Sequence, residues 1–202
     1  MTSESNHHEA ETIRDVFGVW FNAAKTVLIR APEMLHGHYT IPDGVTTIGK
    51  EAFFGCWELT SITMPASMTT VEYGAFWNCG GLTSVNFSPN VAVIGDYAFW
   101  DCNRLTGMTL PDRLMTIGDY AFWGCSELNR FIIPSGVKCI GNCAFEGCGS
   151  PAEIIFCGDA PTISEYAFYW MPVTAYYPAN NPTWTEEVRQ DYGGSFIWKC
   201  ME

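Results

Sequence analysis

The cysteines of this chain keep a regular spacing, and that spacing constrains the fold more than any other feature of the sequence. Five of them stand 23 residues apart, at Cys56, Cys79, Cys102, Cys125 and Cys148. A phenylalanine stands three residues before each of these cysteines, and Phe168 extends that column by one more period. The spacing predicts a solenoid of stacked coils, because a unit this short can bury its apolar face only against its neighbours.

Each unit contains a segment that alternates polar and apolar residues, as a half-buried strand does. The segment covers residues 61–64 in one unit, and its counterparts are 84–87, 107–110, 130–133 and 153–156. Stacked in register, these segments are expected to form a parallel sheet. A proline follows several of them, and it bends the chain out of the sheet because it lacks an N–H group.

In the other half of each unit, the apolar residues have the spacing of a helix. Apolar residues at i, i+1, i+4 and i+7 would share one face of a short helical turn, as at Ala52, Phe53, Cys56 and Leu59. A glycine column marks a second bend, which is predicted to favour positive φ, at Gly49, Gly95, Gly118 and Gly141. Strand, bend and helical turn together close one coil.

The repeated pattern Ile-Gly-x-x-Ala-Phe-x-x-Cys-x-x-Leu-x-x-Ile-x-Ile-Pro resembles the BspA-like class of leucine-rich repeats. Residues 94–111 and 117–134 match it almost position by position, and the resemblance covers residues 41 to about 178. It implies a leucine-rich-repeat-like right-handed coil with a parallel β-sheet on one face and short helical or 3-10 turns on the other. It also implies bacterial and protist proteins that are often displayed on cell surfaces and are associated with adhesion and protein binding. It carries over no catalytic residue.

On this interpretation the chain has four segments. Residues 1–14 form a disordered acidic tail, 15–40 a capping β-hairpin or degenerate repeat, 41–179 about six BspA-like repeats, and 180–202 a C-terminal cap. Caps are expected because an open solenoid exposes its core and unpaired strand edges at its terminal coils. The C-terminal cap is predicted to contain a short helix around residues 185–192 and a strand at 195–198.

Charge and hydropathy exclude two classes of partner. The formal net charge is −12 and no basic cluster is present, so the chain would repel the phosphates of a nucleic acid. No run of about eighteen apolar residues is present that could cross a bilayer as a helix. The acidic, polar start lacks the positive charge and apolar stretch of a secretory signal, so the chain as it stands is expected to be cytoplasmic. Cell-surface or secreted localisation stays open if it is a fragment of an exported protein.

The nine cysteines could suggest a disulfide framework, but an odd number with five in one apolar column favours reduced, internal thiols. A thiol tolerates burial and can donate weakly to a backbone carbonyl, although stacked coils would also bring neighbouring cysteines close to disulfide distance. Cys139, Cys143, Cys157 and Cys200 lie outside the column. The first three have poor spacing for structural zinc, so neither a metal site nor a cofactor is predicted.

A second aromatic column follows the core phenylalanines by one residue and is expected to point away from the core. We define the aromatic strip as the four members of this column, together with two tyrosines of a parallel column: Phe54, Trp77, Trp100, Trp123, Tyr97 and Tyr120. These rings would either cover the coil edges and support one another, or form a contact surface for a protein partner or for stacked sugar rings.

No Gly-x-Ser-x-Gly, phosphate-loop or dinucleotide motif occurs, so no enzyme activity is predicted. The leading hypothesis is a non-catalytic binding module that recognises a protein or a glycan through an extended solenoid surface. The alternative is a structural or self-associating repeat scaffold. A cysteine-based redox or metal site is the third hypothesis.

Overall fold

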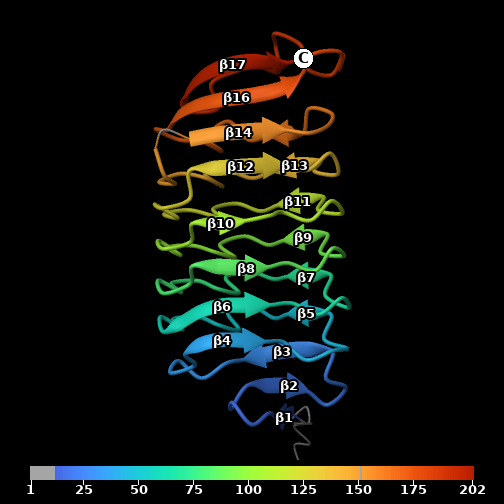
Figure 1. The fold of residues 1–202 in the computed structure, drawn as a ribbon, viewed down its shortest axis with the longest axis vertical. Coiled ribbons are helices and arrows are strands. Elements are labelled where there is room, and N and C mark those ends of the chain that lie inside the picture. The colour runs from blue at the N-terminus through green and yellow to red at the C-terminus, as the bar shows by residue number, and fades with distance from the viewer. Residues whose placement is uncertain (1–11, 151) are drawn as a thin grey trace, which may run out of the picture.

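Short β-strands stacked along one long axis make up the fold, as Figure 1 shows. The structure is a computed structural model that describes residues 12–150 and 152–202. One sheet has nine strands, in the order β1 (Thr12–Arg14), β2 (Trp20–Asn22), β3 (Val27–Arg30), β5 (Thr47–Ile48), β7 (Thr70–Val71), β9 (Val93–Ile94), β11 (Thr116–Ile117), β13 (Cys139–Ile140) and β15 (Thr162–Ile163).

Two four-stranded sheets follow one another along the front of Figure 1. The first has the order β10 (Gly107–Met108), β8 (Ser84–Asn86), β6 (Leu59–Thr63) and β4 (Gly37–Thr40). The second has the order β12 (Arg130–Ile133), β14 (Ala152–Phe156), β16 (Pro172–Pro178) and β17 (Ser195–Met201). Every strand pair in both sheets is parallel, which confirms the predicted solenoid of stacked parallel strands.

The predicted parallel sheet is present, and the coil also carries parallel strands on the opposite face, where the prediction placed only helical or 3-10 turns. The nine-stranded sheet uses two-residue strands such as Thr116–Ile117, which pairs with β9 and β13. A strand of two residues is too short to show an alternating pattern in the sequence. The strands of the front face form two separate sheets, because β10 and β12 do not pair with each other. Gly107 stands in β10 where Ser84 and Arg130 stand in neighbouring units, and glycine weakens a strand.

The N-terminal strands differ from the rest by pairing antiparallel. Strand β1 pairs with β2, and β2 pairs with β3, before the parallel stacking begins between β3 and β5. Residues 12–14, which the sequence analysis placed in a disordered tail, form β1 because Ile13 lies opposite Phe21 in this hairpin. The remainder of that tail lies outside the described residues.

The predicted helical turns are absent from the described residues, which contain no helix. In the first unit, Ala52, Phe54 and Cys56 donate their N–H groups to carbonyls three residues earlier. The alternate residues Phe53 and Gly55 donate instead to Ala75 and Trp77 in the next coil, at 2.8 and 2.9 Å. A helix would need all of these N–H groups for itself, so the segment is a run of separate turns.

The glycine column (Gly49, Gly95, Gly118 and Gly141) was predicted to favour positive φ, and this prediction was wrong. These glycines allow the backbones of neighbouring coils to pack closely. A Cβ on Gly118 would lie 2.5 Å from the backbone nitrogen of Asp96 in the previous coil, and Gly141 has the same relation to Asp119. Positive φ occurs two residues after the glycine column, at Glu51, Gly74, Tyr97, Tyr120 and Cys143.

A stack of six phenylalanine rings runs through the core. The rings of Phe53, Phe76, Phe99, Phe122, Phe145 and Phe168 are fully buried. Successive centroids are 4.8, 5.0, 5.2, 5.5 and 5.1 Å apart, and neighbouring planes lie within 8° of parallel. Offset stacking of this kind adds to the hydrophobic gain from burying each ring.

The alanine and the cysteine of each repeat hold the backbone of a phenylalanine in the coil before. The N–H group of Phe99 donates to the carbonyl of Ala121 at 2.7 Å, and the Cys125 thiol donates to the carbonyl of Phe99 at 3.2 Å. The other ladder thiols repeat this contact: Cys79 to Phe53, Cys102 to Phe76 and Cys148 to Phe122. At the start of the ladder, Cys56 donates to Pro32 at 3.5 Å.

The C-terminal segment also differs from expectation. Residues 185–192 form turns rather than a helix, with Val188 and Arg189 both donating to the Thr185 carbonyl. The strand after them is longer than predicted, since β17 covers Ser195–Met201 and pairs with β16 over its full length. Trp184, 5% exposed, packs against Phe156 with ring centroids 4.7 Å apart. Tertiary packing therefore replaces the predicted helix.

Replacing Phe99 with alanine should remove the middle of the ring stack and lower the free energy of unfolding by about 3–5 kcal/mol. Urea unfolding followed by circular dichroism measures this loss. Met115→Ala, at a residue 51% exposed, is the control and should change stability by about 0.5 kcal/mol or less. A loss below about 1 kcal/mol for Phe99→Ala would contradict the assigned role of the stack.

Candidate functional site

The aromatic strip lies on the connections that lead from the nine-stranded sheet to the front sheets, toward the left in Figure 1. Trp77 belongs to the connection from β7 to β8, and Tyr97 and Trp100 belong to the connection from β9 to β10. Their position follows from the core, because the residue after each buried phenylalanine in the turn has the opposite orientation. Phe54 is 47% exposed, and the other five rings are half-buried.

All six predicted rings are brought into one continuous cluster. Trp100 stacks on Trp123 with centroids 4.2 Å apart, and its centroid is 5.8 Å from that of Trp77. Tyr97 stacks on Tyr120 at 5.0 Å and on Trp100 at 5.1 Å. Phe54 meets the edge of Trp77 at 5.7 Å. The two columns of the strip therefore contact each other as well as their own neighbours.

One member of this cluster was missed in the sequence. The Tyr73 ring lies 5.2 Å from Tyr97 and 6.4 Å from Trp77, although Tyr73 stands one position before the tyrosine column. Gly74 occupies the column position itself, so alignment on the cysteines hid the contact. The Lys50 ammonium group lies 5.0 Å from the centroid of the Tyr73 ring.

The tyrosine column has an unusual backbone conformation. Tyr97 and Tyr120 have φ of 58° and 55°, a left-handed region in which Gly74 and Glu51 also lie. This conformation costs a residue with a side chain about 1–2 kcal/mol, and glycine avoids the cost. Glycine avoids this cost at Gly74, whereas four other coils carry a side chain in this conformation at the same position, and in two of them that side chain is a large ring.

Carboxylates lie beside the tyrosine column. The Asp96 carboxylate accepts the N–H of Asp119 at 2.8 Å, and the Asp119 carboxylate accepts the N–H of Asn142 at 2.7 Å. Burial raises the pKa of the Tyr97 hydroxyl, and the nearby charges of Tyr73, Asp119 and Asp96 raise it further. Tyr97 is therefore a neutral phenol at neutral pH, next to negative charge.

The five cysteines of the ladder are buried, and all nine cysteines of the chain are free thiols. Burial raises the pKa of Cys56 to about 12 and raises those of Cys79, Cys102 and Cys125 well above the usual range. These thiols are therefore protonated at neutral pH and poor nucleophiles, because the thiolate is the reactive form.

The cysteines outside the ladder do not gather into a reactive site. Cys139, Cys157 and Cys200 are exposed, whereas Cys143 is 8% exposed. Burial raises the pKa of Cys143 to about 11, and a hydrogen bond with Glu146 contributes. Within residues 12–150 and 152–202, no three His, Cys, Asp or Glu side chains lie close enough together to hold a metal ion.

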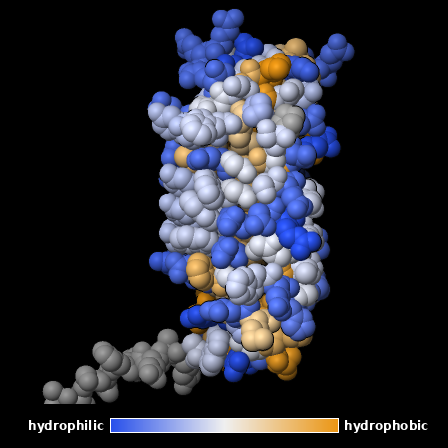
Figure 2. Space-filling view, turned by 90° about the vertical axis from the view of Figure 1, so that its left-hand side faces the viewer, coloured by the Kyte–Doolittle hydropathy of each residue, from blue (hydrophilic) through white to orange (hydrophobic). Residues whose placement is uncertain are grey.

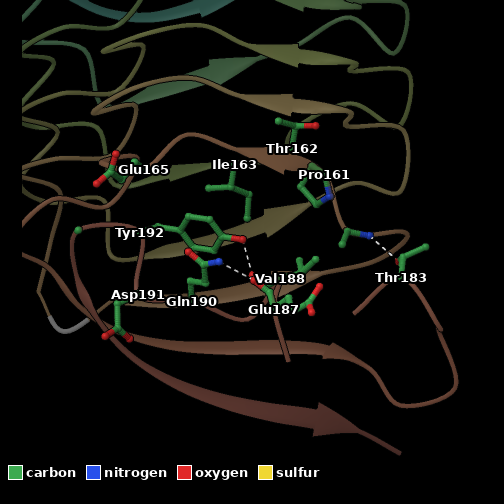
Figure 3. Close-up of a pocket in the computed structure, with 12 residues that line it drawn as sticks. Pro161, Thr162, Ile163, Glu165, Thr183, Glu187, Val188, Gln190, Asp191 and Tyr192 are labelled. Carbon is green, nitrogen blue, oxygen red and sulfur yellow. Dashed lines mark hydrogen bonds between the residues drawn. The ribbon is translucent and has the colours of Figure 1, made fainter. Parts of the chain in front are cut away.

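Two surface hollows were not anticipated from the sequence. The first, of about 600 Å³, lies beside β15 and is shown in Figure 3. Its polar groups bind one another: the Gln190 amide donates to the Glu187 carbonyl at 2.6 Å, and the Tyr192 hydroxyl donates to the Val188 carbonyl. The second, of about 730 Å³, lies on the front face where β10 and β12 do not pair, and Arg130 on its border forms an ion pair with Glu153 at 2.8 Å.

The repeats identify the family. The profile of the BspA type leucine rich repeat region, in six copies, matches residues 37–152, which is more than half of the chain. The protein therefore belongs to the BspA-type leucine-rich repeat family, and the resemblance drawn from the Ala-Phe-x-x-Cys pattern is confirmed. Comparison with curated protein sequences finds no match.

Similar solved structures are bacterial repeat proteins. A leucine rich cell surface protein from Faecalibacterium prausnitzii is 32% identical, with a TM-score of 0.64, over 73% of this chain and 38% of that one. A leucine-rich repeat protein from Bacteroides ovatus is 25% identical, with a TM-score of 0.58, over 85% and 46%. The pneumococcal vaccine antigen PcpA shares the fold, with a TM-score of 0.79 at 18% identity, over 94% and 48%. The chain spans less than half the length of each.

Among the described residues, no helix is long and apolar enough to span a membrane.

Alkylation of the native protein at pH 8 should modify the exposed Cys139, Cys157 and Cys200 and leave the ladder thiols unmodified. Burial protects the ladder, the raised pKa values of Cys56, Cys79, Cys102 and Cys125 add to the protection, and the protection ends when the protein is unfolded in urea. Mass spectrometry after each treatment counts the labels. Rapid labelling of Cys102 in the native protein, or a disulfide between two ladder cysteines, would contradict this assignment.

The raised thiol pKa values also predict that stability falls in alkaline solution. Below about pH 8 the thiols are protonated in both states and contribute no pH dependence. At higher pH the unfolded thiols lose protons at their ordinary pKa while the folded thiols keep theirs, so the free energy of unfolding falls as pH rises. For a thiol such as Cys102 the slope is about 1.4 kcal/mol per pH unit.

Cys102→Ala isolates this effect from other alkaline titrations. Urea unfolding at pH 8.5 and 9.5 should show a shallower fall for the variant than for the unmodified protein. Equal slopes would mean that the Cys102 pKa is not raised by folding.

Proposed function

We propose that this protein is a non-catalytic binding module that recognises a protein or a glycan through its aromatic strip. The observation that supports this most directly is the continuous, partly exposed cluster of seven rings, the strip plus Tyr73, on one side of the solenoid. Tryptophan and tyrosine are the residue types that carry most binding energy in protein interfaces. Display on a cell surface and a role in adhesion are part of the proposal, supported by the family and by the name of the Faecalibacterium protein.

The character of the rings also supports recognition. Trp and Tyr combine an apolar body with a polar group and have few rotatable bonds, so they lose little conformational entropy on binding. Figure 2 shows the side of the left-hand turns, where pale and hydrophilic side chains dominate the middle coils. Such a surface tolerates water when free and offers apolar contact when bound.

The strained tyrosines give a second line of support. A coil needs no ring at the position of Tyr97, since Gly74 occupies the same place in the preceding coil with the same backbone conformation. Glu51 and Cys143 bear the same backbone cost in other coils, so what distinguishes Tyr97 and Tyr120 is the ring, which adds apolar surface to the strip.

A structural or self-associating scaffold is the second candidate. It is favoured by large apolar side chains exposed near the ends of the solenoid: Val16 at 95%, Met34 at 80%, Trp170 at 83% and Ile197 at 61%. In that case the strip only joins coils, and contacts between copies would form at the ends.

The central substitution Trp100→Ala separates the two candidates. Ligands selected from a glycan array and a displayed peptide library should lose about 2 kcal/mol or more of binding free energy, while the fold is retained. The matched control is Trp57→Ala, which removes a tryptophan that is 68% exposed and lies outside the strip. A lowered melting temperature with unchanged affinity would reject the binding role and favour the scaffold.

A further inference from the structure

We propose that the partner of the aromatic strip is a positively charged peptide segment, whose Arg or Lys side chains lie over the rings and pair with the carboxylates beside them. This inference rests on the proposed function, because it assigns the chemistry of the ligand to the same surface. It is carried by a contact within the chain, by the placement of acids around the rings and by the spacing of the coils.

The chain itself provides an example of the contact. The Lys50 ammonium group lies 5.0 Å from the centroid of the Tyr73 ring and 3.8 Å from a carboxylate oxygen of Glu51. The face of an aromatic ring is negative, so a cation above it is attracted, and a carboxylate at the side adds to the attraction. Among the described residues, no other Lys or Arg lies over a ring of this cluster.

Acids surround the rings that have no such cation. Asp96 and Asp119 stand directly before Tyr97 and Tyr120, and Glu146 occupies the tryptophan column after Trp123. None of these three carboxylates forms an ion pair within the part of the chain that the structure describes. Asp96 and Asp119 are fixed in place because each accepts an N–H group from the next coil.

Charge decides between the kinds of ligand that the rings could accept. An apolar helix on this surface would take water away from the carboxylates without replacing its hydrogen bonds, which is unfavourable. The hydroxyl groups of a neutral glycan would donate to the carboxylates but would leave their negative charge uncompensated. A basic segment would pair with them, and the net charge of −12 would accelerate its approach. An acidic or nucleic-acid ligand would be repelled.

The spacing of the coils fits an extended peptide. Adjacent coils rise by about 4.8 Å, so the four coils from Phe54 to Trp123 cover about 14 Å. Side chains on one face of an extended peptide are about 7 Å apart, so three of them cover the same length. The preferred ligand therefore has basic residues at alternate positions.

The test uses the peptide Arg-Ser-Arg-Ser-Arg and the same peptide with citrulline, a neutral analogue of similar shape, in place of arginine. Titration of the complete chain, followed by calorimetry and tryptophan fluorescence, should give binding at least tenfold tighter for the arginine peptide. Equal affinity for both peptides would overturn the inference, and the strip would then bind through apolar contact alone.

Protein variants show whether the peptide binds at the strip. Asp96→Asn combined with Asp119→Asn keeps the oxygens that accept N–H groups but removes two charges, and it should weaken arginine-peptide binding at least fivefold. The control combines Asp43→Asn with Asp112→Asn, two exposed acids in the turns after other strands, and should change affinity less than twofold. Equal losses in both pairs would mean diffuse attraction to an acidic protein and would overturn the inference.

Trp100→Leu is expected to weaken arginine-peptide binding at least fivefold, and unchanged affinity would place the peptide elsewhere.

The outcomes also separate this inference from the proposed function. If a neutral glycan or peptide binds and loses affinity in Trp100→Ala while the arginine peptide does not bind, the cationic partner is rejected and the binding role stands. If Trp100→Ala affects stability alone for every ligand, the binding role fails as well.

Discussion

The rest of the structure depends on how each core phenylalanine is held by the coil that follows it. Phe99 illustrates the arrangement: its ring stacks on Phe122, its N–H group donates to Ala121, and its carbonyl accepts the thiol of Cys125. These three contacts with the following coil together fix the position and orientation of Phe99 and the distance between the two coils. An alanine, a phenylalanine and a cysteine at fixed spacing are therefore what a coil needs in order to be stacked again and again.

This arrangement also produces the outer surface. When Phe99 points into the core, Trp100 must point out, and it repeats along the axis at the spacing set by the inner stack. The rings of the strip consequently contact one another from coil to coil. A substitution in the strip would therefore change stability as well as any binding, so only a comparison of affinity with stability for the same variant distinguishes the two roles.

The acidic border arises from a different constraint. Close approach of the backbones leaves no room for a side chain at Gly118 and Gly141, and the next residue of each coil can offer an oxygen to an N–H group of its neighbour. Asp96 and Asp119 fill this position and bring negative charge to the edge of the tyrosines. The rings and the carboxylates are therefore parts of one repeating backbone geometry, which places a carboxylate beside a tyrosine in two neighbouring coils.

The sequence by itself determined the solenoid, the family, the stacked front strands and the grouping of the six strip residues, because each follows from a column that recurs every period. The tertiary structure decided the features that depend on contacts between neighbouring coils. Phe53 and Gly55 give their N–H groups to the next coil, so the local helical pattern yields separate turns, and strands as short as Thr116–Ile117 exist only through pairing with their neighbours. Tyr73 joins the strip for the same reason, since its ring reaches across to Tyr97 from a different column.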